Sequence, residues 1–186
     1  ADTGFGNALN VQRTVKMLER NGASAIQLED QSLPKRCGHL DGKTLVSADE
    51  MNGKIKAALD ARTDDDTMIV ARTDAAAESL DEAIRRANMY LEAGADIIFP
   101  DALISDDDFR RFCREVKAPV LANMTEFGRT PYRTAAELEA LGCRIVIWPV
   151  TSLRIAAKAV GDMYSELADK GSTQGLLDAM QTRAEL

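Results

Sequence analysis

The chain has 186 residues, which is enough for one domain with a buried core. Its 30 acidic and 23 basic side chains give a formal net charge of −7, which argues against a nucleic-acid partner. The sequence has no apolar run of about 18 residues that could span a membrane, and we expect no signal segment. Three cysteines and one histidine exclude a disulfide scaffold and a zinc site built on several histidines, and they predict a reduced, cytoplasmic protein.

Short apolar runs rich in β-branched residues alternate along the chain with amphipathic stretches of helical period. Because these runs are continuously apolar, they predict strands that are covered on both faces, as in a parallel sheet. The five predicted strands are Ala25–Glu29, Thr67–Arg72, Asp96–Pro100, Pro119–Asn123 and Arg144–Trp148.

Signals for helix starts and ends lie between these strands. Ser79 and Glu82 form a potential capping box, in which each side chain bonds the other residue's backbone, and Thr134 with Glu137 repeats the pattern. Ser105 is a predicted N-cap before an acidic first turn. Glycines that can end a helix stand directly before three of the strands, at Gly22, Gly94 and Gly142.

This order of elements predicts an α/β fold with right-handed crossovers, and no linker divides residues 1–186 into domains. Charged or hydrogen-bonding residues follow the carboxyl end of every predicted strand, which is typical of the active face of an α/β barrel. An open doubly wound sheet would also place its site there, but it normally carries a glycine-rich phosphate loop. The segment Thr3–Gly6 does not match that motif.

A cysteine flanked by cations lies in the long connection after the first predicted strand, in the segment Lys35–His39 (KRCGH). Nearby positive charge stabilises a thiolate, so Cys37 could act as a nucleophile or in acid–base chemistry. The alternative is a basic loop that holds a cysteine by chance. Cys113 and Cys143 are expected to be small core residues, since free cysteine is usually buried.

Carboxylates form a second group at or just past the strand ends. Hard oxygen ligands without histidine suit Mg²⁺, which binds one or two carboxylates together with water and substrate oxygens. Asp74 has a competing role as a partner or N-cap of the next helix, which we favour. The group consists of Asp2, Glu29, Asp30, Asp74 and Asp101.

Three arginines could clamp substrate carboxylates with two parallel hydrogen bonds: Arg72, Arg154 and Arg183. Arg72 ends a predicted buried strand, so it should have a charged partner or ligand. Together these residues indicate a Mg²⁺-dependent enzyme acting on a small polycarboxylate, without identifying the reaction.

Several segments give the chain a resemblance to the isocitrate lyase/phosphoenolpyruvate mutase superfamily, and within it to the 2-methylisocitrate lyases. The resemblance covers essentially the whole sequence. KRCGH after EDQ is its most specific part, and MTEFG, TPY and MQTR favour the methylisocitrate lyases. The segments are DTGFGNALNVQRTV, LEDQSLPKRCGHLDGKTLV, ARTDA, ANMTEFGRTPY, WPVTSLRIAAKA and MQTRAEL.

The resemblance implies a (β/α)8 TIM-type barrel that forms a homotetramer with its last barrel helix exchanged between subunits. It also implies cleavage of 2-methylisocitrate to pyruvate and succinate in propionate catabolism, with Mg²⁺ or alternatively Mn²⁺ as cofactor. By resemblance, Cys37 is the general acid, Lys35, His39 and Glu29 belong to the catalytic centre, and Asp2 and Glu29 lie at the metal. The implied substrate-binding residues are Cys37, Gly38, Arg72, Asp101, Asn123, Thr125, Arg154 and Arg183.

Two departures from the family pattern bear on function. Asp101 stands where methylisocitrate lyases usually carry glutamate, so it would reach the substrate through water or shift specificity. The first aspartate of the family's D-x-D metal motif would precede Ala1, and a complete barrel typically needs about 250 residues. We therefore expect residues 1–186 to be a single, N-terminally truncated barrel portion that holds about strands 4–8 and the C-terminal helices, ending with the segment Thr173–Arg183.

Two other interpretations stay open. The first is a sister activity on the same scaffold, either a lyase of another 2-hydroxydicarboxylate such as dimethylmalate or an oxaloacetate hydrolase. A phosphonate mutase is disfavoured, because those members lack the cysteine of KRCGH. The second is a catalytically inactive partial barrel that mainly associates with itself, since a truncated parallel sheet exposes strand edges.

Overall fold

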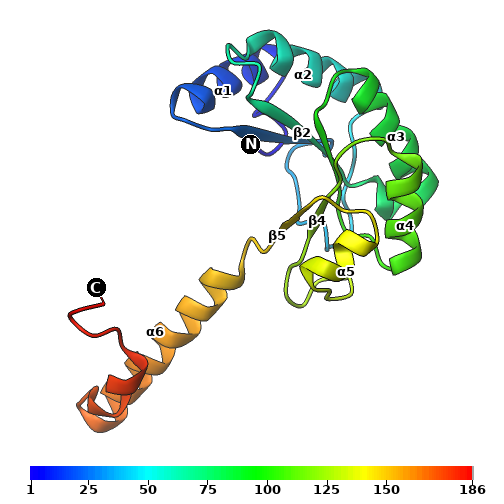
Figure 1. Cartoon of the computed structure of the whole chain (residues 1–186). Coiled ribbons are helices and arrows are strands. Elements are labelled where there is room, and N and C mark those ends of the chain that lie inside the picture. The colour runs from blue at the N-terminus through cyan, green and yellow to red at the C-terminus, as the bar shows by residue number, and fades with distance from the viewer. Residues whose placement is uncertain (186) are drawn as a thin grey trace. The chain divides into compact units, whose positions relative to one another are not determined.

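The computed structural model describes residues 1–185, which divide into two compact units, Ala1–Ile147 and the remainder from Trp148 (Figure 1). The elements are, in chain order, α1 (Ala8–Arg20), β1 (Ala25–Glu29), α2 (Ala48–Ala61), β2 (Met68–Thr73), the 3-10 helix η1 (Ala75–Ala77), α3 (Leu80–Glu92), β3 (Ile97–Pro100), α4 (Asp106–Glu115), β4 (Leu121–Asn123), α5 (Ala135–Ala140), β5 (Ile145–Ile147), α6 (Thr151–Lys170) and the 3-10 helix η2 (Gln174–Ala179).

All five strands are parallel and follow one another in chain order. β1, β2 and β3 form one sheet, β4 and β5 form a second, and a bridge from Ile98 to Val120 connects the two. Each strand lies within two residues of its predicted bounds. The order without a switch point confirms the predicted parallel α/β arrangement, and it brings the carboxyl ends of neighbouring strands together.

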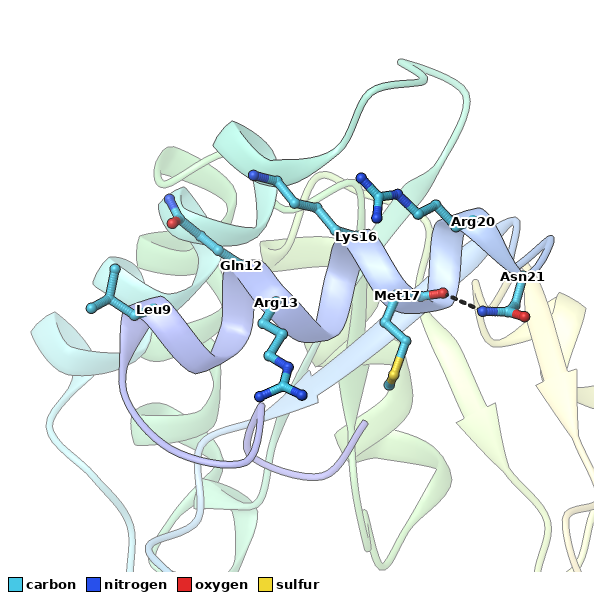
Figure 2. A pocket seen from close by; sticks show the side chains of 7 residues that line it. All are labelled: Leu9, Gln12, Arg13, Lys16, Met17, Arg20 and Asn21. Carbon is cyan, nitrogen blue, oxygen red and sulfur yellow. Dashed lines mark hydrogen bonds between the residues drawn. The ribbon is translucent and has the colours of Figure 1, made fainter.

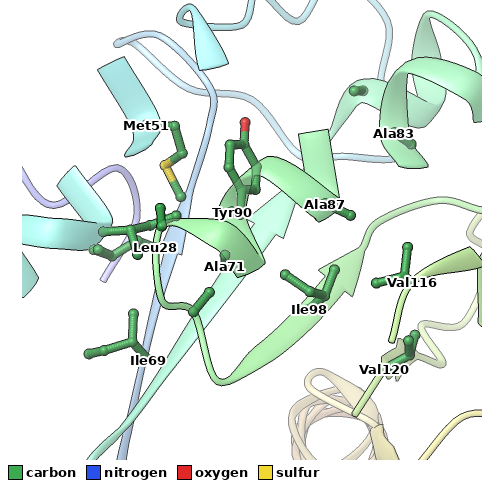
Figure 3. Packing of buried hydrophobic residues seen from close by; sticks show 14 of the residues in the cluster. Leu28, Met51, Ile69, Ala71, Ala83, Ala87, Tyr90, Ile98, Val116 and Val120 are labelled. Atoms are coloured by element: carbon green, nitrogen blue, oxygen red, sulfur yellow. The ribbon is translucent and has the colours of Figure 1, made fainter. Parts of the chain in front are cut away.

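Helices α2, α3 and α4 cover the outer side of the strands in the first unit (Figure 1). The core lies between these helices and the sheet, where Leu28 of β1, Met51 of α2 and Tyr90 of α3 pack together, all fully buried (Figure 3). Ile98 of β3 continues this layer toward Val116 at the end of α4. Burial on the helix side explains why the strands are continuously apolar in sequence.

The predicted caps are mostly confirmed. The Ser79, Ser105 and Thr134 side chains accept hydrogen bonds from backbone N–H groups three residues later, and Thr134 forms a complete capping box with Glu137. The box predicted for Ser79 is only half formed, because the Glu82 carboxylate binds arginines of its own helix instead of reaching back. The glycines before β1, β3 and β5 have the expected left-handed backbone, at Gly22, Gly94 and Gly142.

The two remaining cysteines pack as predicted. Cys143 is buried in the core and the half-buried Cys113 packs against it. Their side chains form a hydrogen bond that, together with burial, raises the pKa of Cys143. Neither thiol takes part in the cluster of charges described below.

The second unit consists of α6 and η2. Neither helix buries a residue, and α6 presents apolar side chains to solvent along its length, such as Leu153, Ile155 and Tyr164. Helix α6 ends at Gly171, whose left-handed backbone turns the chain so that η2 lies against α6 around a cavity of about 350 Å³. The helical segment predicted at Thr173–Arg183 is thus a short 3-10 helix. No helix in residues 1–185 is long and apolar enough to cross a membrane.

Candidate functional site

The candidate site is built at the carboxyl ends of four neighbouring strands. Glu29 ends β1, and Arg72 is the second-last residue of β2. Asp101 directly follows β3, and Asn123 ends β4. The parallel register sets Glu29 opposite Arg72. The first and last of these four residues are more than 90 positions apart in the sequence. The fold brings all four together, as predicted for the active face of a barrel.

Arg72 is the centre of this cluster. Its guanidinium donates from Nε and Nη2 to the two carboxylate oxygens of Asp74, both at 3.0 Å, and from Nη2 to Asp101 Oδ2 at 2.7 Å. Its Nε lies 3.7 Å from Glu29 Oε2. The predicted charged partner of this buried arginine is thus confirmed. Asp74 stands at the N-cap position of η1, as favoured, but its side chain makes no capping hydrogen bond and is held by Arg72 instead.

The environment keeps Arg72 charged. Burial alone would lower its pKa, but its hydrogen bonds to Asp74 and the charges of Asp101, Asp74 and Glu29 outweigh burial and raise the pKa. The guanidinium also lies 5.0 Å from the centre of the Phe99 ring, a cation–π distance. Arg72 is therefore a fixed cation that can bind an anionic ligand without changing its own protonation.

Glu29 and Asp2 converge on one cation. Lys35 Nζ lies 3.1 Å from Glu29 Oε1 and 3.6 Å from Asp2 Oδ1. Glu29 is 2% exposed, and its Oε1 atom has no hydrogen bond of good geometry within residues 1–185. Burial raises the pKa of Glu29, and the charges of Arg72 and Lys35 oppose that shift.

This carboxylate pair fits a hard cation only in part. In residues 1–185 no group of three or more histidine, cysteine, aspartate or glutamate side chains is arranged to hold a metal ion. Asp2 and Glu29 nevertheless share one position for positive charge, and Glu29 keeps an oxygen without a hydrogen bond. Mg²⁺ often takes two carboxylates and fills its other positions with water and substrate oxygens, so the pair is compatible with it.

The KRCGH loop lies directly on the cluster. A Cβ atom added at Gly38 would fall 1.6 Å from Asp101 Oδ2 and 2.5 Å from Arg72 Nη2, so only glycine allows this approach. Cys37 precedes it and is exposed. Lys43, which the sequence reasoning missed, is nearly buried at 3.9 Å from Asp74 Oδ1 and donates a hydrogen bond to the Gly38 carbonyl.

His39 and Asn123 complete the rim of the cluster. Asn123 Nδ2 donates to Asp101 Oδ1 at 3.3 Å, and His39 Nε2 lies 3.7 Å from the same oxygen. His39 Nε2 and Asn123 Oδ1 are buried without a hydrogen-bond partner in residues 1–185. Thr125 lies in the adjoining turn, beside Gly128. Buried polar atoms are normally paired, so unpaired ones gathered around one cluster indicate a ligand.

Asp30 belongs to a different cluster from its neighbour Glu29. It is fully buried on the helix side, where it accepts hydrogen bonds from Tyr90 Oη at 2.7 Å and Arg86 Nη1 at 3.3 Å, both from α3. It also accepts from Thr73 Oγ1 at 2.8 Å and from the Asp74 backbone N–H at 3.0 Å. Asp30 therefore stabilises the carboxyl end of β2. The sequence did not predict Arg86 or Tyr90 as its partners.

Arg154 and Arg183 lie in the second unit, in the first turn of α6 and after η2. Their predicted part in the site stays a prediction. A groove of about 630 Å³ on the outer face of α1 contains no predicted site residue; Figure 2 shows that its lining comes from that helix and Asn21, with three basic side chains, Arg13, Lys16 and Arg20.

A family model described as phosphoenolpyruvate phosphomutase matches residues 1–168, which is most of the chain. The chain belongs to this family. It is 55% identical to the 2-methylisocitrate lyase of Aeropyrum pernix, over the whole chain and 60% of that protein. The predicted resemblance to the isocitrate lyase/phosphoenolpyruvate mutase superfamily is thus confirmed.

Solved structures of other family members share the fold. A 2,3-dimethylmalate lyase matches with a TM-score of 0.92 and 36% identity, over all of this chain and 62% of the other. A phosphonopyruvate hydrolase in complex with oxalate and Mg²⁺ matches with a TM-score of 0.85 and 35% identity, over 99% of this chain and 64% of the other. The α/β fold is therefore the TIM-barrel-like fold of this superfamily, and the chain spans about three fifths of the length of the curated relative it matches.

Proposed function

We propose that the protein is a carbon–carbon lyase that cleaves 2-methylisocitrate to pyruvate and succinate. The observation that carries the proposal is the cluster around Arg72, in which buried atoms of His39 and Asn123 have no hydrogen-bond partner and Glu29 Oε1 is held only by the ion pair with Lys35. Carboxylate oxygens of a small hydroxy polycarboxylate would accept hydrogen bonds from Arg72 and His39, and its hydroxyl group or a bound cation would meet the acceptor oxygens of Glu29 and Asn123. The 55% identity to a 2-methylisocitrate lyase supports this substrate among small polycarboxylates.

In the proposed reaction, the bond between the hydroxyl-bearing carbon and its neighbour breaks. The hydroxyl group gives its proton to a basic group of the site and becomes the carbonyl of pyruvate, while the electron pair of the broken bond stays on the carbon that becomes part of succinate. Cys37 donates the proton that quenches this carbanion in the proposal, which is supported by its exposure and by its neighbour Gly38, which packs on the cluster. Arg72, Lys35 and Lys43 stabilise the negative charge that develops.

Asp2 and Glu29 are the residues that would hold Mg²⁺, or Mn²⁺, in this proposal, and His39 contributes to the catalytic centre beside Cys37. When bound, the ion supplies positive charge to the oxygens of the hydroxy-acid part of the substrate. Its entry requires Lys35 to give up the position between the two carboxylates. The raised pKa of Glu29 reflects a buried carboxylate that gains from such a cation.

Substrate binding is assigned to Gly38, Arg72, Asp101, Asn123 and Thr125 from the first unit. Arg154 and Arg183 complete the set in the proposal, as cations for the remaining carboxylates. We further infer that the chain provides about strands 4–8 of a barrel and that the protein works as a homotetramer.

The test is Mg²⁺-dependent cleavage of four separate substrates, measured as pyruvate from 2-methylisocitrate and from dimethylmalate, as glyoxylate from isocitrate and as oxalate from oxaloacetate. We expect 2-methylisocitrate to be cleaved fastest, with loss of activity in chelator and recovery on adding Mg²⁺. Arg72→Ala is the negative control, and Arg110→Ala, at an exposed residue of α4, is the matched positive control. Absence of pyruvate release from 2-methylisocitrate with a folded protein would overturn the proposal.

A sister activity is the second candidate, and Asp101 favours it. Its short carboxylate is held by Arg72 and Asn123, so it reaches less far toward a ligand than glutamate would. The 2,3-dimethylmalate lyase fold neighbour makes dimethylmalate the natural comparison, with oxaloacetate hydrolysis next. Faster cleavage of dimethylmalate than of 2-methylisocitrate would select this candidate, whereas a self-associating protein without any of these activities would select the inactive partial barrel.

A further inference from the structure

The imidazole of His39 is held between two loops that are far apart in the sequence. His39 belongs to the KRCGH loop, and the turn at residues 125–129 follows β4. In this turn Gly128 N–H donates to the Thr125 carbonyl at 3.3 Å, and the next backbone N–H, that of Arg129, donates to His39 Nδ1 at 3.0 Å. The ring therefore takes its position from a backbone group 90 residues away.

This hydrogen bond determines where the imidazole proton lies. A backbone N–H can only donate, so His39 Nδ1 must be the acceptor and carry no proton. A neutral ring then bears its proton on Nε2, which is buried and lacks a hydrogen-bond partner in residues 1–185. That nitrogen faces the cluster, 3.7 Å from Asp101 Oδ1. The turn thus converts His39 into a single neutral donor that is directed at the site.

The approach of the turn to the ring depends on Gly128. A Cβ atom added there would fall 3.0 Å from both Cε1 and Nδ1 of His39 and 2.8 Å from Thr125 Cγ2. The Arg129 side chain makes a separate contact, a salt bridge to Asp41 at 2.6 Å in which both partners are exposed. The backbone contact and the side-chain contact can therefore be removed independently.

The charges around His39 also favour the neutral ring. Burial lowers the pKa of His39. The positive charges of Arg72, Lys43 and Arg129 lower it further, and the negative charge of Asp101 opposes this shift. Asp41 lies outside this group, on the far side of the Arg129 side chain. Protonation of Nδ1 would set two donors against each other, so the turn itself resists the charged form.

We propose that the turn at residues 125–129 is a positioning element for the site, in which the Arg129 backbone N–H fixes His39 as the Nε2–H tautomer and Gly128 allows the contact. His39 then offers a donor to an oxygen of the bound oxyacid. The nature of that acceptor rests on the proposed function, whereas the tautomer does not. Gly128 and Arg129 are positioning residues in this scheme and touch no reacting atom.

The tautomer can be read directly by ¹⁵N NMR of histidine-labelled protein, because His39 is the only histidine in the sequence. A protonated and an unprotonated imidazole nitrogen give widely separated signals. We expect an unprotonated Nδ1 and a protonated Nε2 near neutral pH, with a titration midpoint below the ordinary value of 6.5. A proton on Nδ1 in the unmodified protein would overturn the proposal.

Two variants of one residue form the matched pair. Arg129→Ala removes the salt bridge to Asp41 and the Arg129 charge but keeps the backbone N–H, so the nitrogen signals should still show the Nε2–H form and the midpoint should rise only slightly. Arg129→Pro removes the N–H, so the Nδ1–H form should appear and the midpoint should rise toward 6.5. Identical spectra for the two variants would contradict the proposal.

Gly128→Ala is the second route if Arg129→Pro does not fold. Its methyl group must displace either the turn or the ring, so it should shift the nitrogen signals in the same direction as Arg129→Pro. An unchanged spectrum in a folded Gly128→Ala protein would overturn the proposal. Pyruvate release from 2-methylisocitrate is measured on the same samples. If the imidazole nitrogen signals are as expected but no pyruvate is released, only the proposed function is overturned. If pyruvate is released but the nitrogen signals differ from those expected, only the tautomer assignment is overturned.

Discussion

Two clusters of buried charge lie back to back at the end of β2, and they differ in how completely they are paired. On the helix side, Asp30 accepts four hydrogen bonds and is fully enclosed by α3. On the other side, Glu29, His39 and Asn123 each keep a buried polar atom without a hydrogen bond in the part of the chain that the structure describes. The difference distinguishes a structural cluster from a binding site, because only the incomplete cluster has polar atoms that a ligand could still pair.

The strand alternation connects the two clusters. Successive side chains at a strand end point to opposite faces, so Arg72 and Asp74 serve the incomplete cluster while Thr73 between them bonds Asp30. Asp30 also accepts the Asp74 backbone N–H. Changes in the complete cluster should therefore reduce stability, whereas changes in the incomplete cluster should mainly reduce ligand binding or turnover.

Removal of Asp30 should have the largest effect on stability. Asp30→Ala leaves Arg86 and Tyr90 facing a buried position without its negative charge, and breaking a buried pair of this kind costs about 3–5 kcal/mol. Urea unfolding followed by circular dichroism measures the loss. Asp107→Ala, at an exposed side chain of α4, is the control and should change the free energy of unfolding by less than about 1 kcal/mol. A loss below about 1 kcal/mol for Asp30→Ala would remove the distinction between the two clusters.

Cys37→Ser should show the opposite pattern. Cys37 is exposed and holds no structural contact in the core, so the free energy of unfolding should stay nearly unchanged. If its thiol is the acid, turnover of 2-methylisocitrate should fall by about 100-fold or more. Steady-state kinetics gives the loss, and Cys113→Ala, which changes a thiol remote from the cluster, should retain turnover. A near-normal rate for Cys37→Ser would remove Cys37 from the mechanism.

Much of this arrangement could be predicted from the sequence. The five strands, the polar residues at their carboxyl ends and the need of Arg72 for a charged partner all follow from local patterns, since parallel strands align their ends. KRCGH was sufficient to predict the family. Asp74 occupies the favoured N-cap position, but its side chain binds Arg72 rather than the helix, which local spacing alone could not reveal.

The separation of Glu29 from Asp30 could not be predicted. The two carboxylates are adjacent and chemically alike, and what distinguishes them is Arg86 and Tyr90, which lie 56 and 60 residues beyond Asp30. Lys43 could not be predicted as a site residue for a similar reason. Its loop contains other cations, and only the folded structure shows that the Lys43 side chain is nearly buried beside Asp74. Contacts between distant segments decide the role of a charged residue in these cases.

Gly38→Ala should reduce both stability and substrate binding, each to an intermediate degree. The added methyl group would meet Asp101 Oδ2 and Arg72 Nη2, so the loop must move away from the site. Overpacking of this kind costs about 1–3 kcal/mol of stability, and we expect substrate affinity to fall as well. Gly53→Ala in α2 is the matched control, since its Cβ would meet nothing within 4 Å and a helical alanine should stabilise by about 0.5–1 kcal/mol. Equal stabilities for the two variants would show that the loop does not pack on Arg72 as described.

Glu82 tests the outer edge of the complete cluster and should show the smallest effect. Its carboxylate binds Arg85 and also Arg86, which in turn reaches Asp30. The hydrogen bonds from Arg85 first, and from Arg86, lower the pKa of Glu82 to about 2 from an ordinary 4.5. Because the folded-state pKa is the lower one, the stabilisation is complete above pH 4.5 and is lost as the pH falls toward 2.

Glu82→Gln should therefore destabilise the protein by about 0.5–1 kcal/mol at pH 7, since the pair is partly exposed to solvent. Urea unfolding of both proteins between pH 7 and pH 3 isolates this contribution, because other titrating groups cancel in the difference. The difference should narrow as the pH falls below 4.5. A difference that stays constant over this range would mean that Glu82 holds Arg86 by packing rather than by charge, and that the Asp30 cluster ends at Arg86.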